Sequence, residues 1–373
     1  MTVEKTINSS DIVFFFGAGA SAPFNIPTMK QFVTDFEKVL EEDATKSERL
    51  TYKEIKDALE KRLKRQVDIE AVFTVIDGII NYSPERLGFL SLYCATKFDT
   101  PNSDKKLTCT LLRRKFRNFV SSECCIPQEA FSKIKEIYHD FFNRFALELG
   151  NYNENGKYAY NSNWTMFTTN YDLCLEYYWR EVAHVAIDTG FDFERVRNVT
   201  VLRPYKLLQE STGLIQLFKL HGSVDWLIEK GTNDVIEVET AKGQSHMGRK
   251  YKGEMMLYPI AEKELYLDPY VSMILRLNRE LEKKSTWVVI GYSFADPVIR
   301  EIFLRKFNSK KKLVLVHKKA SEVYRERLSH IKGDVSLMEK QFGMENTFRQ
   351  TNHQIMHKLK DNPVFKASEE PLP

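Results

Sequence analysis

Short, continuous apolar runs alternate with amphipathic stretches along most of this chain. The first run, Ile12–Phe16, is rich in branched and aromatic side chains, which is typical of a strand buried on both faces of a parallel sheet. Similar runs, each followed by a helical stretch, occur within residues 163–172, 214–226, 286–299 and 311–317. This alternation predicts an α/β fold with a Rossmann-like parallel sheet, covered by helices on both faces.

The region between the first run and the second has a different pattern. From about Ser47 to Gly150, apolar residues recur every three or four positions among many charges, which predicts amphipathic helices. We therefore expect one α/β domain made of residues 1–30 and 160–340, with a helical insertion over residues 31–159. Residues 341–373 are expected to form a C-terminal helix and tail, a possible oligomer or partner contact.

A weaker pattern covers residues 227–259, where two short apolar segments flank a glycine-containing stretch. This pattern predicts a hairpin or a mobile flap.

Composition and charge argue against several classes of protein. The chain of 373 residues has 55 Lys and Arg against 51 Asp and Glu, a net charge of +4, which is too small to predict direct nucleic-acid binding. Two basic runs, residues 113–119 and Lys310–Lys312, are interpreted as solvated faces. The N-terminus is polar and no apolar run approaches the ~18 residues of a membrane span. We expect a cytoplasmic protein without membrane contact.

Polar or glycine-rich segments follow four of the predicted strands. They are GAGAS at residues 17–21, TTNYD at 168–172, HGS at 221–223 and GYSFAD at 291–296. Ligands bind at the carboxyl ends of strands in open parallel sheets, so we expect the four segments to converge on one crevice. The glycines of GAGAS let phosphates approach backbone N–H groups. A flexible loop is the alternative, because glycine pairs are common after buried strands. The segment also lacks the third glycine of the dinucleotide fingerprint.

These four segments, together with Asn25–Pro27, resemble in order and content the motifs of the sirtuin (silent information regulator) family. Members of that family bind NAD in a Rossmann-like fold and cleave its nicotinamide–ribose bond. The resemblance covers the predicted α/β part and excludes the helical block. It implies that NAD is the substrate of this protein.

The resemblance also implies a role for each matching residue. Asn170 and His221 are implied to be catalytic. The residues implied to bind NAD are Gly17, Ala18, Gly19, Ala20, Ser21, Ile26, Pro27, Thr169, Asp172, Gly291, Ser293 and Phe294. Cleavage at C1′ passes through a ribosyl cation, and a histidine can accept the proton of the nucleophile near neutral pH. Asp296 precedes Pro297 and is interpreted as the start of a helix.

The sequence departs from the protein-deacylating members of the family, which carry a zinc ribbon with two C-x-x-C pairs after the histidine motif. The five cysteines of this chain all precede that motif and form no C-x-x-C pair; they are Cys94, Cys109, Cys124, Cys125 and Cys174. We therefore expect no zinc and no acyl-lysine groove. Water is then the expected nucleophile.

The expected activity is that of an NAD glycohydrolase. The resemblance to zinc-less bacterial sirtuin-like proteins implies an NAD-depleting effector of antiphage defence by abortive infection. It also implies a homo-oligomer under the control of a partner, a HerA-type ATPase or, as second choice, a short Argonaute. Two alternatives remain: an NAD-dependent deacylase or ADP-ribosyltransferase, and a noncatalytic regulator that binds NAD or ADP-ribose. The presence of both Asn170 and His221 favours an enzyme.

Overall fold

The computed structural model describes residues 9–64, 67, 69–80, 103–148, 164–196, 199–203, 215–229, 235–237, 251–256, 269–343 and 348–360. The chain divides into two compact units. One unit covers residues 27–123, and the other contains the remaining described residues.

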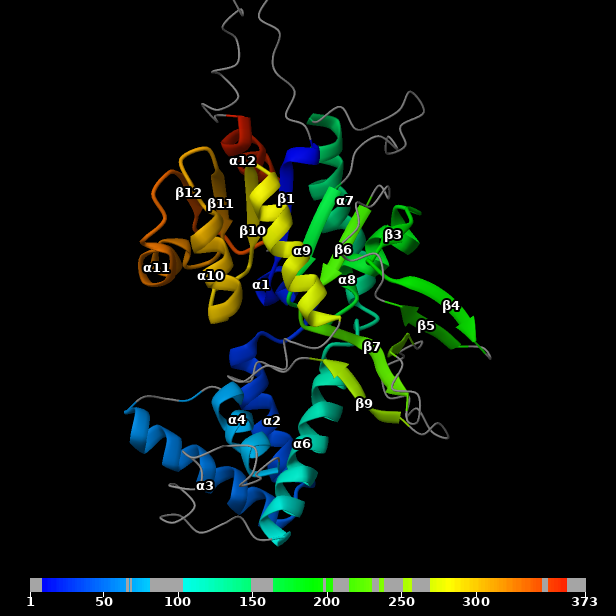
Figure 1. Cartoon of the computed structure of the whole chain (residues 1–373), viewed down its shortest axis with the longest axis vertical. Coiled ribbons are helices and arrows are strands. Elements are labelled where there is room, and N and C mark those ends of the chain that lie inside the picture. Colours follow the sequence, from blue (N-terminus) through cyan, green and yellow to red (C-terminus); the bar gives the residue numbers. More distant parts are fainter. Residues whose placement is uncertain are drawn as a thin grey trace, which may run out of the picture. The chain divides into compact units, whose positions relative to one another are not determined.

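The larger unit contains a seven-stranded parallel sheet with the order β12-β11-β10-β1-β2-β6-β3 (Figure 1). Its strands are β1 (Ile12–Phe16), β2 (Trp164–Thr168), β3 (Ile187–Asp188), β6 (Ile215–Lys219), β10 (Thr286–Ile290), β11 (Lys312–Val316) and β12 (Asp334–Met338). Without the edge strand β3, this is the 3-2-1-4-5-6 order of dinucleotide-binding sheets. The predicted Rossmann-like α/β fold is confirmed.

The winding of the sheet reverses between β1 and β10. β1 pairs with β2 on one edge and with β10 on the other, in parallel both times. Such a switch point leaves a crevice outside the carboxyl ends of the strands. Every residue of β1, β2, β6, β10 and β11 is buried, which explains why these strands read as continuous apolar runs.

Helices cover both faces of this sheet (Figure 1). The α-helices of this unit are α1 (Ala18–Ser21), α7 (Ala130–Glu148), α8 (Cys174–Tyr177), α9 (Tyr270–Lys283), α10 (Pro297–Lys306), α11 (Ala320–Val323) and α12 (Phe348–Lys360). Short 3₁₀-helices form η1 (Ser9–Asp11) and η2 (Ala22–Phe24), and π-helical segments form η3 (Tyr178–Val182) and η4 (Tyr324–Leu328).

Successive side chains of β1 point to opposite faces of the sheet. On one face, the ring of Phe14 lies 6.1 Å from that of Phe141 in α7, and Ile355 of α12 joins the same core. On the other face, Phe15 lies 5.4 Å from Phe303 of α10. α7 falls within the range predicted for the insertion, yet its apolar residues belong to the core of the sheet.

A second, antiparallel sheet has the order β4-β5-β8-β7-β9. Its strands are β4 (Asp192–Val196), β5 (Val199–Arg203), β7 (Gly222–Glu229), β8 (Val235–Glu237) and β9 (Tyr251–Met256). β7 and β8 form an antiparallel hairpin with Trp226 opposite Glu237. The two apolar segments that flank the glycine-containing stretch correspond to β8 and β9, and they lie on opposite sides of β7, so the hairpin predicted between them is wrong. The rest of the predicted flap, residues 230–234, 238–250 and 257–259, lies outside the described residues.

The smaller unit is helical, as its sequence pattern predicts. Its described helices are α2 (Met29–Asp43), α3 (Lys46–Leu63), α4 (Ile69–Ile80) and α6 (Ser103–Glu123). The rings of Phe73 and Phe116 stack at 4.0 Å between α4 and α6. The basic run in α6 contributes ion pairs within this unit, because Arg113 contacts Asp77 at 2.9 Å. None of the described helices is both long enough and apolar enough to cross a membrane.

The interpretation of Lys310–Lys312 as a solvated face is wrong for two of the three residues. Lys311 and Lys312 are 7% and 2% exposed. Lys311 Nζ donates to the carbonyl oxygens of Glu282 and Lys284 at 2.6 and 2.8 Å, and Lys312 pairs with Asp334 at 3.2 Å.

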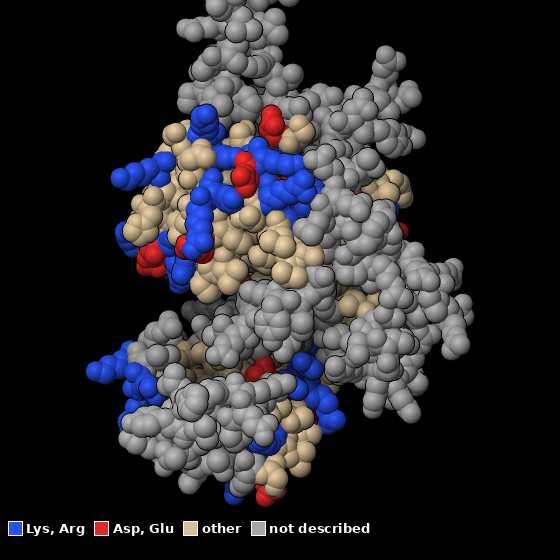
Figure 2. Space-filling model, in the orientation of Figure 1, with Lys and Arg blue, Asp and Glu red and all other residues tan. Residues whose placement is uncertain are grey.

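Figure 2 shows Lys and Arg side chains gathered on one face of the larger unit. Exposed basic residues of α9, α10 and the loops on either side of β11 include Arg279, Lys283, Arg305, Lys310, Lys318 and Lys319.

A buried polar cluster lies between α9 and the sheet. Arg276 contacts Glu280 at 3.0 Å and donates to Gln216 Oε1 of β6 at 3.1 Å. Lys284, which follows α9, donates to Ser10 O at 2.8 Å. Burial lowers the pKa of Lys284 from 10.5 to about 8, against the opposing effect of Glu280. This lysine therefore makes folding dependent on pH.

We predict that Lys284→Met removes a pH-dependent part of the stability. Between pH 8 and 10.5 the unfolded chain keeps a proton that the folded Lys284 releases, so stability rises with pH there, by about 3 kcal/mol in total. Denaturant unfolding at pH 7.5 and 10 should show this gain in the wild type and in Lys283→Met, an exposed neighbour. The gain should be absent from Lys284→Met. Equal pH dependence in all three proteins would contradict the prediction.

Candidate functional site

The loops after β1 and β10 cross at the switch point with no side chain between them. Gly19 N donates to Gly291 O at 2.9 Å, and Gly17 N donates to Ile290 O at 2.9 Å. A Cβ on Gly17 would lie 2.6 Å from Tyr292 Cα, and one on Gly19 would lie 2.8 Å from Gly291 Cα. Gly291 has a φ of +66°, and a Cβ there would lie 2.3 Å from Ala20 N. Only glycine fits these three positions.

This crossing gives the glycines a role that the sequence reasoning missed. The amide groups of Gly17, Gly19 and Ala20 all donate to carbonyl oxygens of the chain itself, so they are not bare donors awaiting a phosphate. The glycines are required because two backbones touch. The assignment of these glycines and of Ala18 to NAD binding stays a prediction.

We predict that Gly291→Ala destabilises the protein by about 2–4 kcal/mol, because it adds both steric overlap and a strained φ. The loss should appear as a lower free energy of unfolding in denaturant. Gly78→Ala is the matched control: its Cβ would meet nothing within 4 Å in α4, and alanine should gain roughly 0.5–1 kcal/mol in a helix. Wild-type stability of Gly291→Ala would disprove the packing argument.

Asn170 joins the loop after β2 to the loop after β1. Its Nδ2 donates to Gly17 O at 3.0 Å and to Ser21 Oγ at 2.9 Å. A carbonyl oxygen can only accept, so the NH₂ group must face Gly17 and the Oδ1 must face away. Among the described residues Oδ1 has no partner. The half-buried side chain therefore offers one acceptor, held from behind by two hydrogen bonds.

His221 follows β6 and meets the loop after β10. Its Nε2 lies 3.1 Å from Asp296 Oδ2, and the two side chains are only 9% and 7% exposed. β6 and β10 are separated by β2 and β1, a distance of about 14 Å across the sheet. The two loops therefore reach over the ends of β1 and β2 to make this contact.

Lys219, the last residue of β6, supports the loop that carries Asn170. Its buried Nζ donates to Tyr171 O at 3.2 Å and to Asp172 O, and it pairs with Glu176 at 3.0 Å. Burial acts to lower the pKa of Lys219, but Glu176, Asp225 and Asp172 outweigh it and raise that pKa above 10.5. The ammonium charge is thus retained in the interior.

The other residues predicted to bind NAD differ in burial and in the unit to which they belong. Asp172 is buried, and its Oδ1 accepts from Cys174 N at 3.0 Å. Ile26 is 5% exposed and belongs to the hydrophobic core, while Pro27 belongs to the smaller unit. Ser293 is exposed, and Phe294 is fully buried with a φ of 55°. Thr169 is half-buried and donates its N–H to Phe16 O at 3.2 Å.

Two residues of this site were missed or misjudged from the sequence. Asp296 does start a helix, because its Oδ1 accepts from Val298 N at 2.9 Å, but its second oxygen contacts a histidine 75 positions away. No local pattern could show that contact. Lys219 did carry a signal, since it is the one charged residue in the apolar run LIQLFKL.

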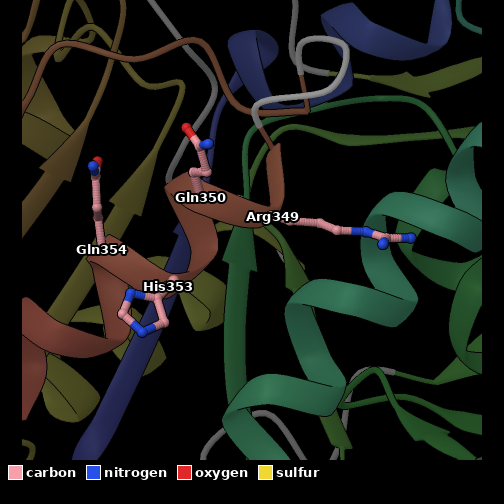
Figure 3. A pocket seen from close by; sticks show the side chains of 4 residues that line it. All are labelled: Arg349, Gln350, His353 and Gln354. Carbon is pink, nitrogen blue, oxygen red and sulfur yellow. The ribbon is translucent and has the colours of Figure 1, made fainter.

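A pocket of about 370 Å³ lies elsewhere, beside α12. Its lining residues, Arg349, Gln350, His353 and Gln354, come from a single helix (Figure 3). The side chain of Arg349 extends toward α7 (Figure 3), where Glu136 lies 3.8 Å away. None of the four residues belongs to a strand-end loop, so this pocket is separate from the candidate site.

Within the described part of the chain, no three His, Cys, Asp or Glu side chains are grouped so as to hold a metal ion. Cys94 lies outside that part. The expectation that the protein needs no zinc stays a prediction.

The fold and the strand-end loops define a Rossmann-like α/β protein with its candidate site at the switch point. Residues 165–333 match the family model described as SIR2-like domain. The match spans less than half of the 373 residues; it includes Asn170, His221 and Asp296 and excludes residues 17–21. No curated protein matches the chain.

Solved structures of Sir2 homologues are similar at low identity. A Sir2 homologue in complex with NAD is 12% identical with a TM-score of 0.42, over 94% of this chain and 89% of the other. A Sir2 homologue variant with ADP-ribose is 14% identical with a TM-score of 0.41, over 94% of each chain. A triple variant with 2′-O-acetyl ADP-ribose is 14% identical with a TM-score of 0.42, over 100% and 97%. Similarity at this level does not establish a shared activity.

Proposed function

We propose that this protein is an NAD glycohydrolase, which cleaves the nicotinamide–ribose bond with water to give nicotinamide and ADP-ribose. The supporting observation is the placement of Asn170 and His221 at the carboxyl edge of a sheet with the 3-2-1-4-5-6 order. Dinucleotides bind at that edge in sheets of this order. A binding module would need neither a histidine paired with a carboxylate nor an anchored amide with a spare acceptor.

The residues at the switch point fit a dinucleotide as substrate. Ser293 is exposed there, and its hydroxyl can donate to a phosphate or a ribose oxygen. Asn170 Oδ1 faces away from Gly17 and can accept a hydrogen bond from a hydroxyl group. The glycine crossing lies beside them, where the two backbones are in contact and leave no room for a side chain between them.

The proposed reaction needs one base and no acid. The C1′–N bond breaks with its electron pair going to nicotinamide, which leaves neutral, and C1′ becomes cationic. Water adds to C1′, and its proton passes to His221 and then to solvent. Asn170 Oδ1 accepts a hydrogen bond from that water or from a ribose hydroxyl. Because the amide is uncharged and weakly nucleophilic, it does not capture the cation.

We predict that Asn170→Ala and His221→Ala each reduce nicotinamide release by ~10²–10⁴-fold, the usual effect of losing a general base or its positioning partner. The measurement is chromatography of nicotinamide and ADP-ribose after incubation with NAD. Asn118→Ala and His353→Ala remove the same side chains at exposed positions and should keep the wild-type rate. Thermal unfolding would show that each variant is folded.

Product analysis in the same experiment separates the alternatives. Hydrolysis gives ADP-ribose without any added acceptor, whereas a deacylase or transferase would release nicotinamide only with an acyl-lysine peptide or another acceptor present. A noncatalytic regulator would bind NAD and release nothing. A wild-type rate in either Asn170→Ala or His221→Ala would rule out the proposed mechanism.

We propose further that the protein acts as an NAD-depleting effector of bacterial antiphage defence, as a homo-oligomer controlled by a protein partner. The support is the resemblance of its motifs to those of zinc-less sirtuin-like proteins, for which a HerA-type ATPase is the first expected partner and a short Argonaute the second. Phage infection of cells that carry the protein with its partner should lower cellular NAD. Cells with His221→Ala should keep their NAD. Unchanged NAD in the wild-type cells would contradict this role.

A further inference from the structure

Asp296 uses its two carboxylate oxygens for two different tasks. Oδ1 accepts from Val298 N at 2.9 Å and Ile299 N at 3.4 Å, which caps the start of α10. Oδ2 lies 3.1 Å from His221 Nε2, with both side chains more than nine-tenths buried. One carboxylate thus joins the first turn of a helix to the histidine of the candidate site.

The capping task alone does not require aspartate. Asn, Ser and Thr cap helices about as well as Asp does. What distinguishes Asp is its second oxygen, which like the first can only accept when the group is ionised. The contact with His221 therefore explains why the residue at position 296 is an aspartate.

This contact determines which nitrogen of the imidazole carries hydrogen. An accepting Oδ2 requires that Nε2 be the donor. A neutral imidazole has one N–H, so Nδ1 must hold the lone pair.

We propose that Asp296 is a positioning residue that fixes His221 as the Nε2–H tautomer, so that Nδ1 is the nitrogen that accepts the proton. The assignment of the tautomer rests on the contact between Nε2 and Oδ2 and on a neutral imidazole. The role of Nδ1 in the reaction rests on the proposed function.

The carboxylate is held on a rigid support. Pro297 begins α10, and its ring fixes the backbone φ just after Asp296. Before it, Phe294 is fully buried, and its carbonyl oxygen accepts from Arg300 Nη1 at 3.3 Å. On the histidine side, Leu220 N donates to Thr168 O at 2.8 Å. Neither partner can move far without breaking these contacts.

Asp296→Asn tests the tautomer directly. Asparagine keeps Oδ1 for the cap, but its amide nitrogen can only donate, so Nε2 can no longer donate to it. Long-range ¹H–¹⁵N spectra of histidine-labelled full-length protein, recorded above pH 8, report the tautomer, and the His221 signal is the one missing from His221→Ala. We expect Nε2–H in the wild type and a changed state in Asp296→Asn. Nδ1–H in the wild type, or identical signals in both proteins, would overturn the proposal.

The kinetic test separates positioning from structure. Asp296→Asn should lower kcat for nicotinamide release by about 10²-fold or more, with KM for NAD and the unfolding temperature close to wild type. Asp296→Ala should lose both activity and stability. Thr45→Ala removes a cap in the smaller unit, where Thr45 Oγ1 accepts from Glu48 N at 3.2 Å; it should lower stability and keep kcat.

The two proposals fail in different ways. If the wild type releases nicotinamide and His221→Ala does not, a wild-type kcat in Asp296→Asn overturns the role of Asp296 and leaves the glycohydrolase standing. If the wild type releases none with or without its partner present, the glycohydrolase fails, and the spectra alone decide the tautomer.

Discussion

The contact between the backbones of Gly19 and Gly291 sets the geometry of everything at this edge of the sheet. It brings together the loops of the two strands on either side of the switch point, and it does so at a separation that no β-carbon permits. Because the amides involved already donate to carbonyl oxygens, the crossing is rigid without a ligand. The floor of the candidate site is therefore formed by the fold itself.

The remaining loops are held around that floor by contacts that form a closed ring. Asn170 joins the β2 loop to the β1 loop, Leu220 N joins the β6 loop to the β2 loop, and His221 joins the β6 loop to the β10 loop through Asp296. Together these links use groups from the ends of β1, β2, β6 and β10. The two candidate catalytic side chains are thus also structural links, which keeps their polar groups fixed relative to each other.

The strands and loops that form this site could be predicted from the sequence, but the contacts between them could not. The sheet could be read from continuous apolar runs such as Ile12–Phe16, since strands buried on both faces must be apolar throughout. The strand-end segments followed from the same reading. Local patterns could not show that Gly17 and Gly291 meet, or that Asp296 contacts His221, because such contacts depend on strand order. Lys310–Lys312 was misjudged for the same reason: whether a lysine lies over a solvated face or over buried carbonyl oxygens is decided by its neighbours in space.

Two buried charges at this edge of the sheet hold loops in place. A buried ammonium or carboxylate costs folding free energy unless it is paired and hydrogen-bonded, and well-packed apolar residues would fill the same space at least as well. Yet Lys219 and Asp296 are both retained in the interior, and each one holds a loop with a candidate catalytic residue. Lys219 binds the carbonyl oxygens that directly follow Asn170, and Asp296 binds His221. Both buried charges therefore help to fix the positions of the candidate catalytic side chains. For such side chains, a displacement of a fraction of an ångström matters more than a gain in stability.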